Sequence, residues 1–192
     1  MKQNRSFIWR TALQTDAEAI AAIYNETVNG GGHSPTLNKS NAANVGHLLR
    51  ESRRNGWLNW VIEHDGQPVA WALLRAIVWG REVCHRTGDL SIYVRHDMQG
   101  QSLPMKMIAQ VYREAPRHGY EAVSCWILGG NRKSLMVARA FRMSLWGCLP
   151  RAACYGDRVD DVMIYGVRFD DPEWRAYMER RIARAERRAG AV

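Results

Sequence analysis

The stretch DLSIYVRHDMQGQSLPMKMI, from Asp89 to Ile108, decides the fold class. Its first part alternates in the period of a β-strand, with apolar side chains at Leu90, Ile92 and Val94. A polar loop over 95–101 follows, and a helical pattern begins at Leu103. The first N–H groups of a helix lack internal partners and lie at the positive end of its dipole. The unit therefore predicts a phosphate site, or else an ordinary capped connection. Pro104 removes one possible donor.

The composition of the chain is that of one globular domain. It has 192 residues, of which 46% are hydrophobic and 24% charged, enough for a substantial core. No apolar run reaches the length of a membrane span, and the N-terminus MKQNRSFIWRTAL lacks the apolar centre of a signal peptide. Four cysteines without a CxxC pair predict reduced, buried thiols rather than a disulfide framework or zinc site. We expect a cytoplasmic protein.

The order of the other elements indicates a mixed α/β sheet flanked by helices. Expected strands are 7–12, 57–64, 69–78, 122–127, 145–152 and 160–168, and expected helices are 16–28, 41–55, 103–118 and 131–143. Thr15 is the expected N-cap of the first helix, and Asp65-Gly66 predicts a hairpin turn.

The net charge of +8 favours an anionic partner such as nucleic acid, a nucleotide cofactor or an acidic surface. Much of it lies in the segment 169–192, which is expected to form a basic amphipathic helix after a domain spanning 7–168. An apolar stripe recurs there at helical spacing, and arginines line another side, at Arg180, Arg184, Arg187 and Arg188. This helix docks on the domain or on a second subunit, or it contacts RNA.

Several short patterns lie in register over one fold length. They are Arg10, Asp16 and the run Ala22 to Asn25; Gly66 followed by VAWALL; Arg81, Thr87, Ser91, Tyr93 and Val94; and Asn131 with Ser134. With this element order, the chain resembles the GNAT acyltransferase fold, and most closely its phosphinothricin-acetyltransferase-like branch. The resemblance covers roughly Phe7 to Arg168 and implies an acyl-CoA N-acyltransferase fold.

The resemblance implies acetyl-CoA or another acyl-CoA as co-substrate, and no metal. It places the pantetheine between two splayed parallel strands and the diphosphate on the following loop. The implied cofactor-binding residues are Val94, His96, Gln99, Gly100, Gln101, Ser102 and Leu103, with Asn131 and Ser134. The family's loop pattern has small residues at the positions of Ser102 and Pro104, so the loop is divergent here.

The resemblance also implies a base that takes a proton from the attacking amine, at the position of Asp89. The alternative is that Asp89 pairs with Arg81 or Arg86. Backbone N–H groups near Val94 are expected to stabilise the oxyanion. The usual acid for the thiolate falls on Ala138, which leaves Tyr93 and Tyr155 as candidates. Arg142 and Met143 replace the family's Gly-Phe.

The implied acceptor pocket includes Asn25, Arg75, Trp79 and Arg81, which suit an amino acid or another carboxylate-bearing molecule. The sequence thus predicts an N-acetyl- or N-acyltransferase acting on a small amine. Two alternatives keep the fold: an aminoacyl-tRNA-dependent aminoacyltransferase, which would read a phosphate backbone, and a non-catalytic binding or regulatory protein. A homodimer is possible, and His33, His85 and His96 form no triad or metal spacing.

Overall fold

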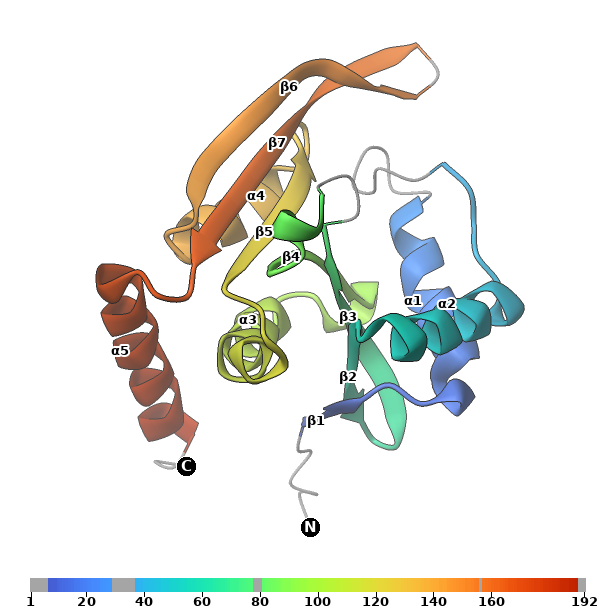
Figure 1. The fold of residues 1–192 in the computed structure, drawn as a ribbon. Coiled ribbons are helices and arrows are strands. Elements are labelled where there is room, and N and C mark those ends of the chain that lie inside the picture. Colours follow the sequence, from blue (N-terminus) through green and yellow to red (C-terminus); the bar gives the residue numbers. More distant parts are fainter. Residues whose placement is uncertain (1–6, 29–36, 78–80, 156, 190–192) are drawn as a thin grey trace.

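The computed structural model describes residues 7–28, 37–77, 81–155 and 157–189 and contains one seven-stranded sheet of order β1-β2-β3-β4-β5-β7-β6 (Figure 1). The strands are β1 Ile8–Thr11, β2 Leu58–His64, β3 Gln67–Ala76, β4 Thr87–Val94, β5 Ala122–Leu128, β6 Ser144–Tyr155 and β7 Arg158–Arg168. All neighbouring strands pair antiparallel except β4 and β5, which are parallel. The mixed α/β fold class is confirmed.

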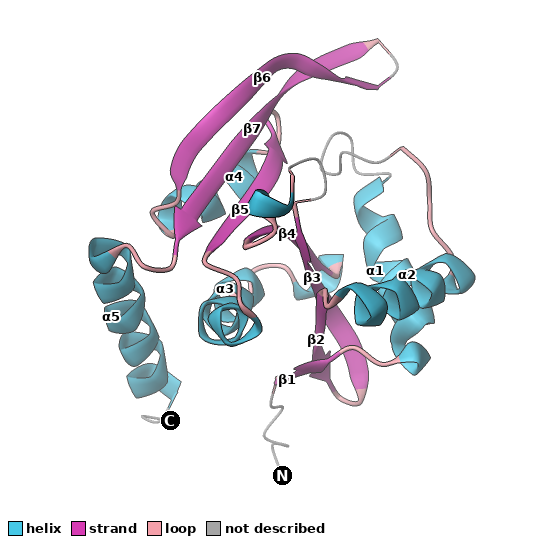
Figure 2. Cartoon of the chain, in the orientation of Figure 1, coloured by secondary structure: helices cyan, strands magenta, loops and turns pink. Residues whose placement is uncertain are grey.

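The helices cover the two faces of the sheet in separate groups, coloured by type in Figure 2. They are α1 Ala17–Val28, α2 Ala42–Asn55, α3 Leu103–Glu114, α4 Arg132–Ala140 and α5 Pro172–Ala189, with 3-10 turns η1 Gln14–Asp16, η2 Glu82–Cys84, η3 His96–Met98 and η4 Ala115–His118. One core joins α1 and α2 to the side chains of Val61, Trp71 and Leu73. The larger core lies on the other face, where α3, α4 and α5 pack.

The chain enters the first helix through an ion-pair cluster. Arg10 on β1 donates two hydrogen bonds to Asp16, at 2.7 and 2.9 Å, and one to Glu63 on β2 at 2.8 Å. Asp16 also accepts the backbone N–H of Leu13. The arginine holds the pKa of Asp16 below its usual value. The cap at this helix entry is therefore the Asp16 carboxylate, and the prediction of Thr15 was wrong.

The other boundaries agree with the sequence patterns within a few residues. Asn41 caps α2 by accepting the N–H of Asn44, and the hairpin turn lies at Asp65-Gly66 as predicted. The β6–β7 hairpin is longer than expected and extends past β5, because β5 pairs with β7 only as far as Val162 (Figure 2).

The cysteines differ from the prediction in their exposure. All four are free thiols, but Cys148 and Cys154 on β6 are exposed and Cys84 and Cys125 are half-buried. The edge strand β6 is solvent-facing along most of its length, which the alternation of its residues did not reveal. Within the described part of the chain, no helix is long and apolar enough to cross a membrane.

Helix α5 belongs to the main core. Trp174 and Met178 are buried in it, and the Trp174 indole N–H donates to the Phe141 carbonyl oxygen at 2.7 Å. The carbonyl groups at the end of α4 have no partner within that helix, so α5 satisfies one of them. The apolar stripe predicted for this segment thus docks on the domain.

Truncating the docked face of α5 is expected to destabilise the whole domain. Met178 is fully buried, so Met178→Ala should lower the free energy of unfolding by about 2–5 kcal/mol. Arg180 on the exposed side is the matched control, and Arg180→Ala should change it by less than about 0.5 kcal/mol. Urea unfolding followed by circular dichroism measures both, and equal effects would mean that α5 does not support the core.

Candidate active site

The parallel strands β4 and β5 pair over only three residues each. Thr87, Gly88 and Asp89 pair with 122–124, and the ladder ends there. Beyond that point β4 keeps pairing with β3 as far as Val94, and β5 keeps pairing with β7. The facing edges of 90–94 and 125–128 therefore carry backbone N–H and C=O groups without a strand partner. Such groups bind a ligand that carries amides of its own.

Asp89 lies at the apex where the two strands diverge. Arg75 stands opposite it on β3, and its Nε and Nη2 donate to Asp89 Oδ2 at 3.3 and 3.2 Å. The Asp89 side chain is 18% exposed. Burial raises the pKa of this carboxyl, and the charge of Arg75 acts in the opposite direction. The predicted partners, Arg81 and Arg86, are wrong: Arg81 is exposed, and Arg86 pairs with Glu121 at 2.7 Å.

Two weaker acids near the apex are kept protonated by burial. Burial raises the pKa of the Cys125 thiol on β5 to about 12, with a further contribution from Asp89. It also raises the pKa of Tyr93 on β4 to about 12. A thiol in this state is a poor nucleophile, so Cys125 is unsuited to carry an acyl group. Asp89 is the ionisable group at the apex that can accept a proton.

Tyr93 faces α1 with its ring in an aromatic cluster. It stacks on Trp71 with 5.0 Å between ring centroids and meets the edge of Tyr24 at 5.4 Å. The structure gives Tyr93 no hydrogen bond to Asp89.

Tyr155 lies far along the β6–β7 hairpin. It pairs with Arg158, whereas the level of Asp89 corresponds to Gly166 on β7, eight residues away. Eight strand residues span roughly 26 Å. The Tyr155 hydroxyl lies 3.4 Å from Asp160, which accepts the N–H of Gly130 at 2.8 Å. The structure therefore does not bring Tyr155 together with Asp89.

The loop between β4 and α3 presents free backbone donors. Gly100 and Ser102 have φ of +87° and +57°, the left-handed conformation. Within the described residues, the N–H groups of Gly100, Ser102 and Leu103 have no acceptor, although Pro104 in the first turn offers none. Consecutive free N–H groups at a helix start form an anion-binding concavity. This geometry suits the predicted diphosphate despite the proline.

Other predicted cofactor residues have identifiable partners. Asn131 caps α4 by accepting the N–H of Ser134 at 3.1 Å, and the N–H of His96 donates to Glu26 on α1 at 2.6 Å. Gln99 accepts a hydrogen bond from Lys133 on α4 at 3.0 Å, so the loop and α4 are in contact. The side chain of Leu103 is fully buried, and Val94 packs against the same core.

The predicted acceptor residues are not all brought together. Arg75 lies at the apex beside Asp89. The Asn25 carboxamide brackets the backbone of Ser40, donating to its carbonyl oxygen and accepting its N–H. Trp79 and His33 lie outside the described residues. The sequence missed the contacts of Glu26 and Lys133 with the loop, because each spans elements far apart in the chain.

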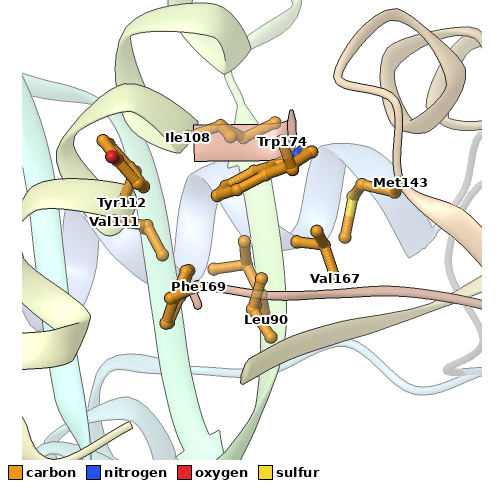
Figure 3. A pocket seen from close by; sticks show the side chains of 9 residues that line it. Leu90, Ile108, Val111, Tyr112, Met143, Val167, Phe169 and Trp174 are labelled. Carbon is orange, nitrogen blue, oxygen red and sulfur yellow. The ribbon is translucent and has the colours of Figure 1, made fainter. Parts of the chain in front are cut away.

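The pockets of the described structure lie elsewhere. Figure 3 shows an apolar gap of about 10 Å³, less than one water molecule needs, inside the larger core. Among its lining side chains are Leu90, Ile108, Val111, Tyr112, Met143, Val167, Phe169 and Trp174. A hollow of about 530 Å³ lies between the end of α3 and the start of α5 and contains none of the predicted site residues. Among the described residues, no group of three or more His, Cys, Asp or Glu side chains is placed to hold a metal ion.

Comparison with known proteins assigns the class. The sequence model of the acetyltransferase (GNAT) family matches residues 18–141, well over half of the chain. The chain therefore belongs to the GNAT family of acetyltransferases, and it is an N-acyltransferase by that membership.

Individual relatives agree with this class. YwnH of Bacillus subtilis (strain 168), described as a "Putative phosphinothricin acetyltransferase", is 25% identical over 166 residues, which cover 82% of this chain and 96% of YwnH. An N-acetyltransferase from Staphylococcus aureus Mu50 superposes with a TM-score of 0.81 at 21% identity, covering 86% of this chain and 99% of that one. A phosphinothricin acetyltransferase from Sinorhizobium meliloti, solved in complex with AcCoA, gives 0.78 at 19% identity, covering 84% and 88%.

Exchanging Gly100 tests whether the loop binds the cofactor. Gly100 and Gly119 have φ of +87° and +84°, and a Cβ at either meets no atom within 4 Å. Each change to alanine should therefore cost a similar 1–2 kcal/mol, roughly, in stability. Only Gly100→Ala should weaken acetyl-CoA binding, by about 3-fold or more, because the alanine disfavours the φ that orients the free donors. Calorimetric titration measures the dissociation constants, and equal affinities would refute the assignment.

Proposed function

We propose that this protein transfers an acetyl or other acyl group from acyl-CoA to the amine of a small, amino-acid-like acceptor, with Asp89 as the base. The observation that carries the proposal is the position of Asp89, a half-buried carboxylate at the point where β4 and β5 diverge. The unpaired strand edges suit a pantetheine arm, and the N–H groups of 100–103 suit its diphosphate. The AcCoA complex of the Sinorhizobium meliloti relative supports this donor.

The proposed reaction is direct attack without an acyl-enzyme. Asp89 takes one proton from the acceptor ammonium, and the amine nitrogen then forms a bond to the thioester carbonyl carbon. Backbone N–H groups on the free edge of β4 stabilise the oxyanion. The C–S bond breaks, and the thiolate takes the second nitrogen proton through water. Asp89 returns its proton to solvent. The protonated state of Cys125 supports this route over a covalent one.

Replacement of the proposed base should separate chemistry from binding. Asp89→Asn is expected to lower kcat by roughly 10²–10⁴-fold while leaving the calorimetric affinity for acetyl-CoA within about 3-fold. Asp170→Asn is the matched control, because Asp170 is an exposed partner of Arg168 remote from the apex. An Asp89→Asn enzyme of unchanged kcat would exclude this residue as the base.

The pH dependence should show the same group. A base must be deprotonated, so kcat/KM should fall as the pH falls through the pKa of Asp89. Burial raises this pKa, so the acidic limb should lie above the titration range of an exposed aspartate. Rate measurements between about pH 4 and 9 test this, with a pH-stable acetyl-CoA affinity as the internal control. The limb must be absent in Asp89→Asn.

An aminoacyl-tRNA donor is the second candidate, and one observation favours it. The exposed side of α5 carries arginines with no ion-pair partner among the described residues, at Arg175, Arg180, Arg184 and Arg187. Titration with acetyl-CoA at low and moderate salt decides between the donors. Micromolar affinity at both supports acyl-CoA, whereas no binding to acetyl-CoA together with salt-sensitive binding to tRNA supports the alternative. The same preparation establishes whether the protein forms a homodimer.

A further inference from the structure

The ion pair at the apex uses only half of its hydrogen-bonding capacity. Both N–H groups that Arg75 directs at Asp89 converge on Oδ2, at 3.3 and 3.2 Å. Asp89 Oδ1 and Arg75 Nη1 have no partner among the described residues. A free carboxylate oxygen and a free guanidinium N–H thus lie on one adjoining pair.

The chain builds a closed arginine–aspartate pair elsewhere, which makes the open one informative. Arg10 contacts both oxygens of Asp16, at 2.7 and 2.9 Å, and that carboxylate side chain is 6% exposed. The Arg75–Asp89 contacts are longer, and the two side chains are 39% and 18% exposed. Charge-assisted pairs that serve structure alone are usually short and bidentate. The open pair can therefore exchange a partner at lower cost.

We infer that Arg75 receives an anionic group of the acceptor, and that this exchange frees Asp89 to take the proton of the acceptor's ammonium. The acceptor class is an amine with a carboxylate or similar anion a few bonds from the nitrogen. Such a molecule matches the free oxygen with its ammonium and the free N–H with its anion. The inference rests on the proposed function.

The electrostatics of the apex explain why the exchange activates the base. Among the described residues, the charged and titratable groups that interact with Asp89 are Arg75 from β3, Tyr93 from β4 and Cys125 from β5. Tyr93 and Cys125 are protonated at neutral pH, so Arg75 supplies the charge that opposes the effect of burial. Once an anion neutralises Arg75, burial dominates and the basicity of Asp89 rises. An acceptor without the anion leaves Asp89 paired and weakly basic.

Activity measurements test the acceptor class. Acetyl transfer from acetyl-CoA is measured on the common L-amino acids and on their carboxamides, which keep the amine and lose the anion. The wild-type kcat/KM should favour the acids by about 10-fold or more, the usual effect of a hydrogen bond to a charged group. Arg75→Met should abolish this preference, Arg75→Lys should keep part of it, and Arg86→Met, at an exposed arginine paired with Glu121, should leave it unchanged. Equal rates on acids and amides, or a preference that survives Arg75→Met, would overturn the inference.

A second measurement needs no acceptor turnover. The Asp89 carboxyl is titrated by carbon-13 NMR, with Asp89→Asn to assign its signal and acetate as the anion probe. Saturating acetate should raise the pKa of Asp89 in the wild type and have no effect in Arg75→Met, in which the pKa should already be raised. An unchanged pKa in Arg75→Met would refute the role of Arg75 even if acetyl-CoA binds. Failure of acetyl-CoA to bind would instead refute the proposed function, and calorimetry reports that separately.

Discussion

The early end of the β4–β5 ladder at Asp89 is the constraint on which the rest of the site depends. Because β4 stays paired with β3 and β5 with β7, the sheet remains whole while two backbone edges diverge inside it. The divergence places Asp89 at the apex, the 95–102 loop at the end of one arm and Asn131 at the end of the other. A ligand that pairs with both edges completes a sheet that the protein alone leaves open.

The burial of the apex gives its groups different protonation states. Tyr93 and Cys125 have no nearby cation strong enough to offset burial, so both stay neutral. Asp89 has Arg75, which offsets part of the cost of a charge there. A site with one ionised carboxylate among neutral acids suits the abstraction of a proton from an ammonium. It suits covalent catalysis by Cys125 poorly, because a thiolate would be required.

Local patterns predicted most of the fold, and long-range register decided what they missed. The strand, loop and helix of 89–108 and the Asp65-Gly66 turn were predictable, because periodicity and turn chemistry act within a few residues. The partner of Asp89 was not. Arg81 and Arg86 are closer in sequence, but the β3–β4 register sets Arg75 opposite it. The Asp16 cap likewise depends on Arg10 and β2, so the nearer Thr15 was a misleading signal.

The basic composition of α5 has two physical origins that the sequence pattern combines. Arg181 lies over the ring of Phe141, with its guanidinium carbon 5.0 Å from the ring centroid, and its Nη2 is 3.2 Å from the sulfur of Met105 in the first turn of α3. It is a packing residue that joins α4 to the start of α3. The arginines on the outer side of α5 make no such contact. Because α3 begins at the loop of free N–H donors, α5 supports the proposed phosphate site through packing, whatever the outer arginines bind.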